Sequence, residues 1–343
     1  MKKFLNNPRY FVEECLEGIL TVHGEFYRTQ PGNPKAMVLR HFPAQNRVSI
    51  VTGGGMGHLP LFLGYIGDGL CAGAAIGNVF STPGCDSISW VTEQVPHERG
   101  ILYIIGNYVG DIMNFELAAS LAREQGIETR MLIVTDDIAT APRTEMHSRR
   151  CISGIALVYK VAGAAAAMGL SLDEVAAAAE YANSQLGSIG VALTPCQLPD
   201  TQTPIFSIGE NEMEIGVGIH GEPGVRRSKV RRSCEIAEYM LDRVQEDLSL
   251  KSGDRIALMV NGLGATAQEE LFILYRDLHR LCEQRKISID LRYIGNYATT
   301  FGMNGASLSV MKLDEHLYSL LKMPSYSPLV RYYKRTQPYE WEG

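Results

Sequence analysis

The sequence predicts an α/β protein of two domains, with predominantly parallel strands in the first domain and a ligand site in the crevice between the two. Its 343 residues are more than twice the roughly 150 typical of one domain. Short β-branched runs recur, each followed by a glycine-rich or polar turn and a helical pattern, which is typical of parallel strands with crossover helices. Two alanine-rich segments separate these runs from a second set, so we expect domains of residues 1–185 and 186–343.

The first domain is predicted to hold three buried strands. Residues 48–52 run into a glycine-rich loop, residues 101–105 run into a second glycine-containing loop, and residues 131–134 end at two aspartates. Residues 112–125 carry apolar side chains at helical spacing and stop at Gly126. Because the carboxyl ends of parallel strands meet at one edge of a sheet, we expect the first two loops to face the same crevice.

The alanine-rich segments 150–168 and 172–186 are predicted helices, and strands and helices follow them in the second domain. Residues 234–248 are another predicted helix. A further helix is predicted to begin at Thr266, because Glu269 stands three residues later and completes a capping box. The predicted strands of this domain are 189–193, 213–219, 255–260, 287–293 and 306–312.

Composition and charge exclude several classes of protein. The net charge is 32 − 38 = −6 and the basic residues are scattered, which argues against binding to nucleic acid or to anionic membranes. The seven cysteines form no C-x-x-C pair and the N-terminus lacks the apolar run of a signal peptide, so we expect reduced thiols and a cytoplasmic protein. The longest apolar stretch, residues 155–170, is shorter than the roughly 20 residues of a membrane span.

The first candidate motif is Gly53-Gly54-Gly55-Met56-Gly57-His58. Glycines directly after a strand let a ligand approach backbone N–H groups. The segment is neither a P-loop, which ends in Gly-Lys-Ser/Thr, nor a dinucleotide fingerprint, because His58 stands where the third glycine belongs. A purely structural turn is the alternative, but four glycines followed by a histidine favour a functional loop.

Two further candidate residues follow predicted strands. Asp111 can reach the same crevice as His58 or, alternatively, cap the next helix. His220 lies within a segment whose glycines and proline fix the backbone and leave the imidazole accessible, Gly216-Val217-Gly218-Ile219-His220-Gly221-Glu222-Pro223-Gly224. A neutral histidine suits nucleophilic or acid–base chemistry near physiological pH, although a histidine satisfied by hydrogen bonds in a turn is the alternative.

Metal and hydrolase chemistry have less support. His58, Asp111 and His220 are of metal-binding types, but no His-x-x-x-His or cysteine-rich spacing accompanies them. A Ser-His-Asp hydrolase would need a Gly-x-Ser-x-Gly elbow, which the sequence lacks. We therefore predict no metal site. A metal-dependent aldolase is kept as a third hypothesis, behind the two that are given below.

Taken together, the motifs resemble the dihydroxyacetone-binding (DhaK) subunit family of bacterial dihydroxyacetone kinases, and the likeness runs over nearly the whole chain. The segments that carry it are Gly53-Gly54-Gly55-x-Gly57-His58-x-Pro60, Gly64-Tyr65-Ile66-Gly67, Asn107-Tyr108-x-Gly110-Asp111-Ile112-x-Asn114-Phe115-Glu116, Arg149-Arg150, Asn211-Glu212-Met213-Glu214 and Gly216 through Gly224. The resemblance implies a phosphotransferase with an alcohol acceptor that takes part in glycerol metabolism.

The resemblance also implies roles for single residues. The histidine matching His220 attacks the ketone carbon and holds the substrate as a covalent hemiaminal, whereas the residues matching His58 and Asp111 hydrogen-bond it. The aspartate is then the base that accepts a proton from the hydroxyl being phosphorylated. The expected substrate-binding residues are Gly54, Gly55, Met56, Gly57, His58, Gly106, Asp111 and His220.

Partners follow from the same resemblance. The sequence carries no Walker-type loop and no all-helical nucleotide-binding domain like that of fused family members, so we expect no cofactor on this chain. A helical partner subunit is expected to hold Mg-ATP, or Mg-ADP recharged by a phosphotransferase-system protein. The family subunit is usually a homodimer, and no nucleic-acid or membrane partner is expected.

Three positions depart from the family pattern. Met56 stands where serine is common, Leu59 follows the loop histidine in place of glutamate, and Gly106 replaces a lysine before Asn-Tyr. Loss of that cation could enlarge the pocket for a four-carbon ketose such as erythrulose, or weaken catalysis. The alternative to a kinase subunit is a ketose-sensing coactivator of a transcription factor, as some relatives of this subunit are.

Overall fold

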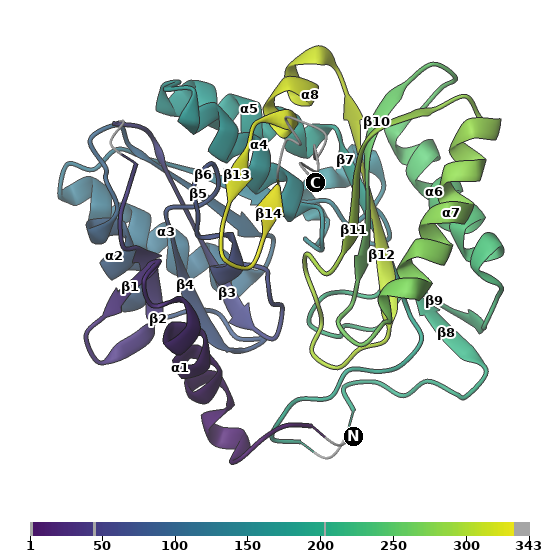
Figure 1. Ribbon diagram of the computed structural model, residues 1–343, viewed down its shortest axis with the longest axis horizontal. Coiled ribbons are helices and arrows are strands. Elements are labelled where there is room, and N and C mark those ends of the chain that lie inside the picture. The colour runs from purple at the N-terminus through teal and green to yellow at the C-terminus, as the bar shows by residue number, and fades with distance from the viewer. Residues whose placement is uncertain (1–2, 44–45, 202–203, 333–343) are drawn as a thin grey trace, which may run out of the picture.

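The computed structural model describes residues 3–43, 46–201 and 204–332, which form two six-stranded sheets with helices between and outside them (Figure 1). This arrangement confirms the predicted α/β fold class. A short pair, β13 (Ser325–Tyr326) and β14 (Arg331–Tyr332), stands apart from both sheets. None of the helices in the described residues is long and apolar enough to cross a membrane.

The first sheet has the strand order β1-β2-β4-β3-β5-β6 and is parallel from β4 to β6, as predicted. Its strands β3 and β5 are buried along their whole length, as expected for a parallel sheet with both faces covered. Because β3 and β5 are neighbours and parallel, the segments that follow them leave the sheet at the same edge. The strands are β1 (Tyr27–Gln30), β2 (Asn33–Leu39), β3 (Ser49–Met56), β4 (Gly73–Val79), β5 (Ile101–Gly106) and β6 (Thr129–Val134).

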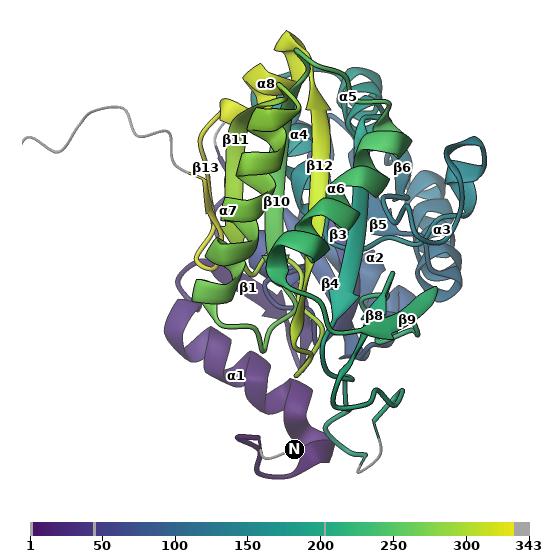
Figure 2. The same cartoon turned by 90° about the vertical axis from the view of Figure 1, so that its right-hand side faces the viewer.

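The second sheet has the order β11-β10-β12-β7-β8-β9, and only the β10–β11 pair within it is parallel. The outer face of this sheet is covered by α6 (Ser233–Leu248) and α7 (Gln268–Gln284), which face the viewer in Figure 2. The strands are β7 (Leu186–Ala192), β8 (Glu212–Ile215), β9 (Arg226–Lys229), β10 (Arg255–Gly262), β11 (Ser288–Gly295) and β12 (Gly305–Leu313). The division into domains after residue 185 stays a prediction.

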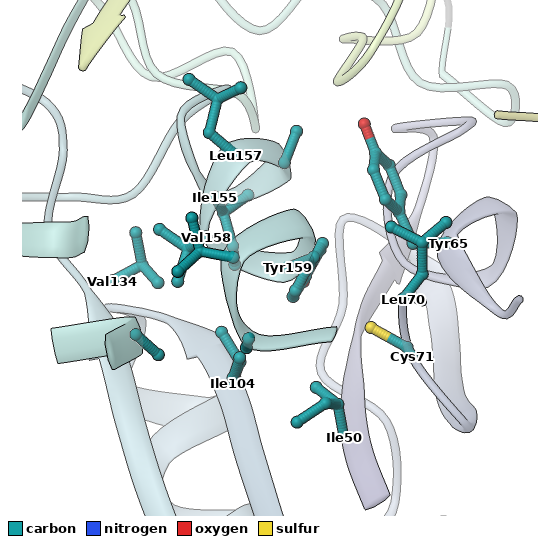
Figure 3. Close-up of a cluster of buried hydrophobic side chains, with 14 of the residues drawn as sticks. Ile50, Tyr65, Leu70, Cys71, Ile104, Val134, Ile155, Leu157, Val158 and Tyr159 are labelled. Carbon is teal, nitrogen blue, oxygen red and sulfur yellow. The ribbon is translucent and has the colours of Figure 1, made fainter. Parts of the chain in front are cut away.

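A central helix, α4 (Ile155–Ala167), joins the two sheets. It is buried from Ile155 to Ala166, and its side chains share one apolar cluster with residues of both sheets. Figure 3 shows Ile155, Val158 and Tyr159 of this helix beside Ile104 and Val134 of the first sheet. This continuous packing holds the two sheets in one arrangement.

The remaining helices surround this framework. The outer face of the first sheet is covered by α2 (Cys85–Gln94) and α3 (Val109–Glu124), while α5 (Leu172–Ser184) packs beside α4 on its inner face. A true capping box begins α5, with Ser171 and Glu174 as partners. The other helices are α1 (Phe11–His23), α8 (Glu315–Lys322) and the short 3-10 helices Pro8–Tyr10, Leu63–Tyr65 and Arg143–Ser148.

Two predicted strands have different ends in the structure. The strand predicted over residues 48–52 continues through the glycines to Met56, so Gly53, Gly54 and Gly55 belong to the central strand β3 rather than to a loop. The strand predicted over residues 213–219 stops at Ile215, because Gly216 turns the chain with a φ of +79°.

Three predicted helix starts are also wrong. The helix predicted to begin at residue 112 begins at Val109 and so includes Asp111. The first alanine-rich helix begins at Ile155 rather than at residue 150, because the buried Asp136 carboxylate accepts the N–H groups of Ile152 and Gly154 in a turn before it. The helix predicted to start at Thr266 begins at Gln268 with Ala267 as its N-cap. The Thr266 hydroxyl bonds Asn304 and the Gly305 backbone instead, so the expected capping box does not form.

Candidate functional site

His58 follows β3 and is buried, with only 1% of its surface exposed. Its Nδ1 lies 2.8 Å from the carbonyl oxygen of Thr299, in the loop between β11 and β12. A carbonyl can only accept, so Nδ1 carries the proton and Nε2 is left as a bare acceptor. Burial chiefly, and then the charge of His220, lowers the pKa of His58 to about 3. His58 is therefore neutral at physiological pH, and its buried Nε2 has no hydrogen-bond partner among the described residues.

His220 lies in the loop between β8 and β9, and a neighbouring carboxylate fixes its orientation. Glu222 accepts the backbone N–H of His220 at 3.0 Å through Oε2 and faces its Nδ1 at 3.3 Å through Oε1. The proton that bridges to the carboxylate sits on Nδ1, so Nε2 keeps its lone pair. The side chain is 19% exposed, which leaves the ring accessible.

Electrostatics keep Glu222 ionised. Burial alone would raise its pKa, but the hydrogen bond and charge of His220, helped by Arg150, outweigh burial and lower the pKa of Glu222 to about 2. Arg150 is itself held by Asp137, with Nη2 2.8 Å from Oδ2, and donates to the carbonyl oxygen of Gly216 at 2.8 Å. Arg150, the second residue of the Arg149-Arg150 motif, thus supports the start of the His220 loop.

Four rings bring the two predicted histidines together. The ring centroids of His58 and His220 are 4.8 Å apart, and the Tyr108 ring meets His220 edge-on at 4.3 Å. Phe80 stacks on His58 at 4.9 Å and touches His220 at 5.6 Å. Gly57, with a φ of +106°, makes room for this ring, because a Cβ there would lie 2.6 Å from Phe80.

Asp111 lies in the first turn of α3 rather than in a loop. Tyr108 is the N-cap of this helix and makes no side-chain capping bond, and Asp111 is buried. Burial raises the pKa of Asp111 to about 6, although a hydrogen bond with Thr82 and the charge of His220 act in the opposite direction. Its Oδ1 is buried and has no hydrogen-bond partner among the described residues, so the carboxyl keeps a free acceptor.

Three other residues predicted to bind substrate, Gly54, Gly55 and Met56, are packed against other parts of the chain. A Cβ on Gly54 would lie 2.2 Å from the Phe62 ring, and one on Gly55 would lie 2.6 Å from the backbone of Ser81. These two glycines therefore permit close packing of neighbouring chain, and the Met56 side chain is buried in the core cluster. Their part in substrate binding stays a prediction.

Gly106 ends β5 beside Tyr108. A Cβ at this position would lie 3.1 Å from the Tyr108 ring and 3.2 Å from Cβ of Cys151. The Tyr108 hydroxyl donates to the carbonyl oxygen of Cys151 at 2.7 Å, which holds the ring in place. The Tyr108 ring therefore lies where the side chain of the family's lysine would begin, so the loss of that lysine does not simply open space.

Sequence reasoning found both histidines and Asp111 but missed three residues of the site. Phe80 follows β4 in a turn, with a φ of +54°, and no sequence pattern marks it. Thr299 is 241 positions from His58, so only the fold reveals its contact. Glu222 had a local signal, since a carboxylate two residues after a histidine can reach its ring. Among the described residues, no cluster of three His, Cys, Asp or Glu side chains could hold a metal ion.

The fold and the site define a class: a two-sheet α/β protein with a partly exposed histidine beside a buried histidine acceptor and a buried carboxyl group at a nearby helix start. Comparison with known proteins identifies the family. The Dak1 domain model matches residues 17–329, so the chain belongs to the Dak1 domain family. This finding confirms the resemblance to the dihydroxyacetone-binding subunit of dihydroxyacetone kinases.

Several relatives match over nearly the whole of this chain. The dihydroxyacetone-binding subunit DhaK of PTS-dependent dihydroxyacetone kinase 1 from Listeria innocua is 37% identical over 94% of this chain and 98% of the relative. A D-erythrulose kinase from Mycolicibacterium smegmatis is 38% identical over 96% of this chain, which spans 56% of that protein. These relatives are named as kinases or as kinase subunits.

Solved structures agree with this assignment. The dihydroxyacetone kinase operon co-activator Dha-DhaQ superposes with a TM-score of 0.85 and 32% identity, covering 91% of this chain and 96% of the other. The dihydroxyacetone kinase of C. freundii superposes with a TM-score of 0.86 and 32% identity, covering 94% of this chain and 59% of the other. Both a kinase and a co-activator thus share this fold.

Proposed function

We propose that this chain is the substrate-binding subunit of a dihydroxyacetone-type kinase, which captures a short ketose on His220 and presents it to a nucleotide-binding partner subunit. One observation carries the proposal: Glu222 holds Nδ1 of His220, so that Nε2 is the free nitrogen, and the ring lies 4.8 Å from the ring of His58. A nucleophilic nitrogen beside a buried acceptor fits a small molecule that has both a carbonyl and hydroxyl groups.

The capture step balances with the groups present. The Nε2 lone pair of His220 forms a bond to the carbonyl carbon while the π electrons move to the carbonyl oxygen, which takes up one proton from water. The proton on Nδ1 is released to water, so the hemiaminal is neutral. Because Glu222 stays ionised down to a pH of about 2, its carboxylate accepts a hydrogen bond from Nδ1–H and stabilises the positive charge that the ring carries until that proton leaves.

His58 and Asp111 then act on the hydroxyl groups. The Nε2 of His58 accepts a hydrogen bond from one hydroxyl, since its Nδ1 is already committed to Thr299. The carboxylate of Asp111 takes the proton of the hydroxyl to be phosphorylated, because a pKa of about 6 leaves it largely ionised at pH 7 yet more basic than an exposed carboxylate. Covalent capture holds that hydroxyl still for in-line transfer.

The phosphate donor belongs to a partner in this proposal. Relatives from Listeria innocua and Lactococcus lactis are named as subunits of PTS-dependent kinases, which supports a separate helical subunit carrying Mg-ATP, or Mg-ADP recharged by a phosphotransferase-system protein. A homodimer is part of the proposal, and sedimentation of the purified chain at about 10 μM would contradict it by showing a monomer.

The substrate range includes four-carbon ketoses in this proposal. Two relatives of 37% and 38% identity are named L-erythrulose kinase and D-erythrulose kinase. Gly106 stands where the resemblance places a long cationic side chain beside the site. The Tyr108 ring borders the adjacent space. The extra hydroxymethyl group of erythrulose would then lie against an aromatic ring rather than an ammonium group.

Reconstitution tests the proposal. The chain is mixed with the nucleotide-binding subunit of a PTS-dependent dihydroxyacetone kinase and Mg-ATP, and phosphorylated product is measured for dihydroxyacetone, D-erythrulose and L-erythrulose. Product from any of the three supports a kinase subunit. A clear preference for dihydroxyacetone would sink the extension to four-carbon ketoses, and the absence of product from all three would sink the kinase proposal.

A ketose-sensing co-activator is the second candidate function. The superposition on Dha-DhaQ favours it, and so does the missing lysine at Gly106. A sensor captures ketose but yields no phosphorylated product with any kinase subunit. Capture without turnover in the reconstitution, together with ketose-dependent binding to a transcription factor, would therefore select this function.

A further inference from the structure

Asn261 is a buried polar residue that has no part in the chemistry described so far. It lies near the end of β10, a strand inside the second sheet, and none of its surface is exposed. Burying an amide costs free energy unless its oxygen and its N–H groups are hydrogen-bonded. At Asn261 the oxygen accepts two hydrogen bonds and the nitrogen donates two, so the partners of these bonds show what the amide does.

The Asn261 side chain holds the loop between β11 and β12, residues 296–304. Its Oδ1 accepts the backbone N–H groups of Tyr297 at 2.8 Å and Ala298 at 2.9 Å. Its Nδ2 donates to the carbonyl oxygen of Ala298 at 2.7 Å and to Oγ of Ser307 at 2.9 Å. Because two N–H donors meet Oδ1 and two acceptors meet Nδ2, the amide fits in one orientation only.

The next residue of this loop, Thr299, makes three bonds to the segment that carries His58. Its carbonyl oxygen lies 2.8 Å from Nδ1 of His58, and its N–H donates to the His58 carbonyl oxygen at 3.2 Å. Its hydroxyl donates to the Leu59 carbonyl oxygen at 2.9 Å. Ala298 and Thr299 are consecutive, so Asn261 fixes the backbone one residue before the carbonyl that holds the imidazole. The position of that carbonyl therefore depends on the bonds of Asn261.

A buried chain of hydroxyl groups supports Asn261 from its other side. Oγ of Ser307 lies 2.7 Å from Oγ of Ser153, which in turn lies 2.8 Å from Oγ of Ser309. The Ser188 hydroxyl donates to Oγ of Ser309 at 2.7 Å, and no serine of the chain is more than 2% exposed. These serines come from β12, from β7 and from the turn before α4, so the chain ties Asn261 to the framework between the sheets. A buried network whose groups are all bonded is rigid.

We infer that Asn261 is the positioning residue that keeps His58 in the tautomer with its proton on Nδ1. With the Thr299 carbonyl in place, the proton stays on Nδ1 and Nε2 keeps its lone pair. Without that carbonyl, the proton can sit on either nitrogen, and a neutral ring protonated on Nε2 can no longer accept a hydrogen bond there. The consequence for binding rests on the proposed function, in which Nε2 of His58 accepts a hydrogen bond from a ketose hydroxyl.

Two variants of Asn261 and one matched control separate positioning from general stability. Asn261→Ala removes all the bonds of the amide, whereas Asn261→Asp keeps the shape and an acceptor for the two backbone N–H groups but has no N–H of its own. Leu258→Ala is the control, because Leu258 lies on the same strand and is equally buried but packs in the apolar cluster with α6 and α7. Circular dichroism checks the fold of each variant, and urea unfolding measures its stability.

Nitrogen NMR of the histidine-labelled protein reads the tautomer without any ketose or partner, because protonated and bare ring nitrogens give separate signals. The His58 signals are identified by their absence from His58→Gln. We expect the wild type and Leu258→Ala to show a bare Nε2. A protonated Nε2 signal should appear in Asn261→Ala and, more weakly, in Asn261→Asp.

Ketose capture and turnover give the second measurement. In Asn261→Ala the apparent Kd for ketose should rise about tenfold, which is the loss of one hydrogen bond. The rate of phosphorylation at saturating ketose should stay within about twofold of the wild type, because Asp111 is untouched and only binding is weakened. Leu258→Ala should match the wild type in both quantities, although it unfolds at lower urea.

The outcomes decide between positioning and a purely structural role. A protonated Nε2 and weaker capture in the Asn261 variants, with neither in Leu258→Ala, support the inference. A bare Nε2 in every Asn261 variant that folds, or the same change in Leu258→Ala, would overturn it. A shifted tautomer with unchanged capture would show that the ketose does not bond Nε2 of His58. A wild type that captures no ketose would overturn the proposed function, while the tautomer result would still decide the role of Asn261.

Discussion

The two histidines of the site contrast in how the protein holds them. His58 is buried at the end of a central strand, and its loop is bonded from the second sheet through the Thr299 carbonyl and hydroxyl. His220 is partly exposed in a hairpin loop, and its nearest support is Glu222, two residues away. The fold thus fixes His58 through long-range packing and His220 through a local carboxylate. Changes near His58 should therefore alter stability as well as binding, whereas changes near His220 should alter chemistry alone.

Asp111 is buried, as His58 is, and its replacement should have the largest effect on the rate of phosphorylation. Asp111→Asn removes the base but keeps the shape, so phosphorylation should fall by about 10²–10⁴-fold while ketose capture persists. In the wild type the rate should rise with pH through about 6, because the carboxyl must be ionised to accept a proton. Asp86→Asn, in the first turn of α2, is the matched control. Full activity of Asp111→Asn in the reconstituted assay would remove the residue from this role.

Replacing Glu222 tests whether this nearby carboxylate orients the ring of His220. Glu222→Ala leaves Nδ1 of His220 without its carboxylate, so ketose capture should slow by roughly ten- to a hundredfold, the range expected for a hydrogen bond to a charged group. Glu222→Gln keeps an acceptor and should recover part of the rate. Stopped-flow measurement of ketose capture, with the exposed Glu210→Ala as control, distinguishes the two. Equal capture by Glu222→Ala and the wild type would show that the carboxylate does not orient the ring.

His58 should reveal its burial through the pH dependence of stability. Its pKa is about 6.5 when unfolded and about 3 when folded, so between these values the unfolded chain binds the additional proton. The free energy of unfolding therefore falls as pH decreases through this window, by up to about 1.4 kcal/mol per pH unit from this group. His58→Gln should show a shallower slope in urea unfolding between pH 6.5 and 4.5. The control is His97→Gln, because Nδ1 of His97 also contacts a backbone carbonyl. An unchanged slope in His58→Gln would mean that His58 titrates normally in the folded protein.

Gly106→Ala should have the smallest effect. The new methyl group would lie 3.1–3.2 Å from Tyr108 and Cys151, so the ring must yield by a few tenths of an ångström. We expect the free energy of unfolding to fall by about 1 kcal/mol, with a small change in the ratio of dihydroxyacetone to erythrulose capture. Thermal unfolding and competition between the two ketoses measure both effects. No change in either would show that Tyr108 does not border the bound ketose.

Much of this site could be predicted from sequence because its reactive residues follow strands. Strands β3 and β5 are parallel neighbours, and so the segments that carry His58 and Asp111 leave the sheet at the same edge. The role of the glycines was harder to predict, because a glycine in the sequence shows that a small residue is needed but not which neighbouring atoms require it. At Gly55 the neighbour is the backbone of Phe80 and Ser81.

The parts that sequence could not supply depend on long-range contacts. Phe80 reaches His58 through the pairing of β4 with β3, and Thr299 reaches it only after the two sheets have packed on α4. Neither residue stands in a local motif. Element ends were missed where side chains bond distant backbone, as Thr266 does with Gly305. Local propensity decides which elements form, while these tertiary hydrogen bonds decide where they begin.

Carbon NMR of carbonyl-labelled dihydroxyacetone and erythrulose tests the central claim most directly. Each ketose is added to the wild type and to His220→Ala, whose fold is checked by circular dichroism. The account predicts that the wild type converts the bound ketone signal to that of a tetrahedral carbon, whereas folded His220→Ala leaves the ketone unchanged. A tetrahedral signal that persists in His220→Ala, or its absence in the wild type with both ketoses, would contradict capture by His220.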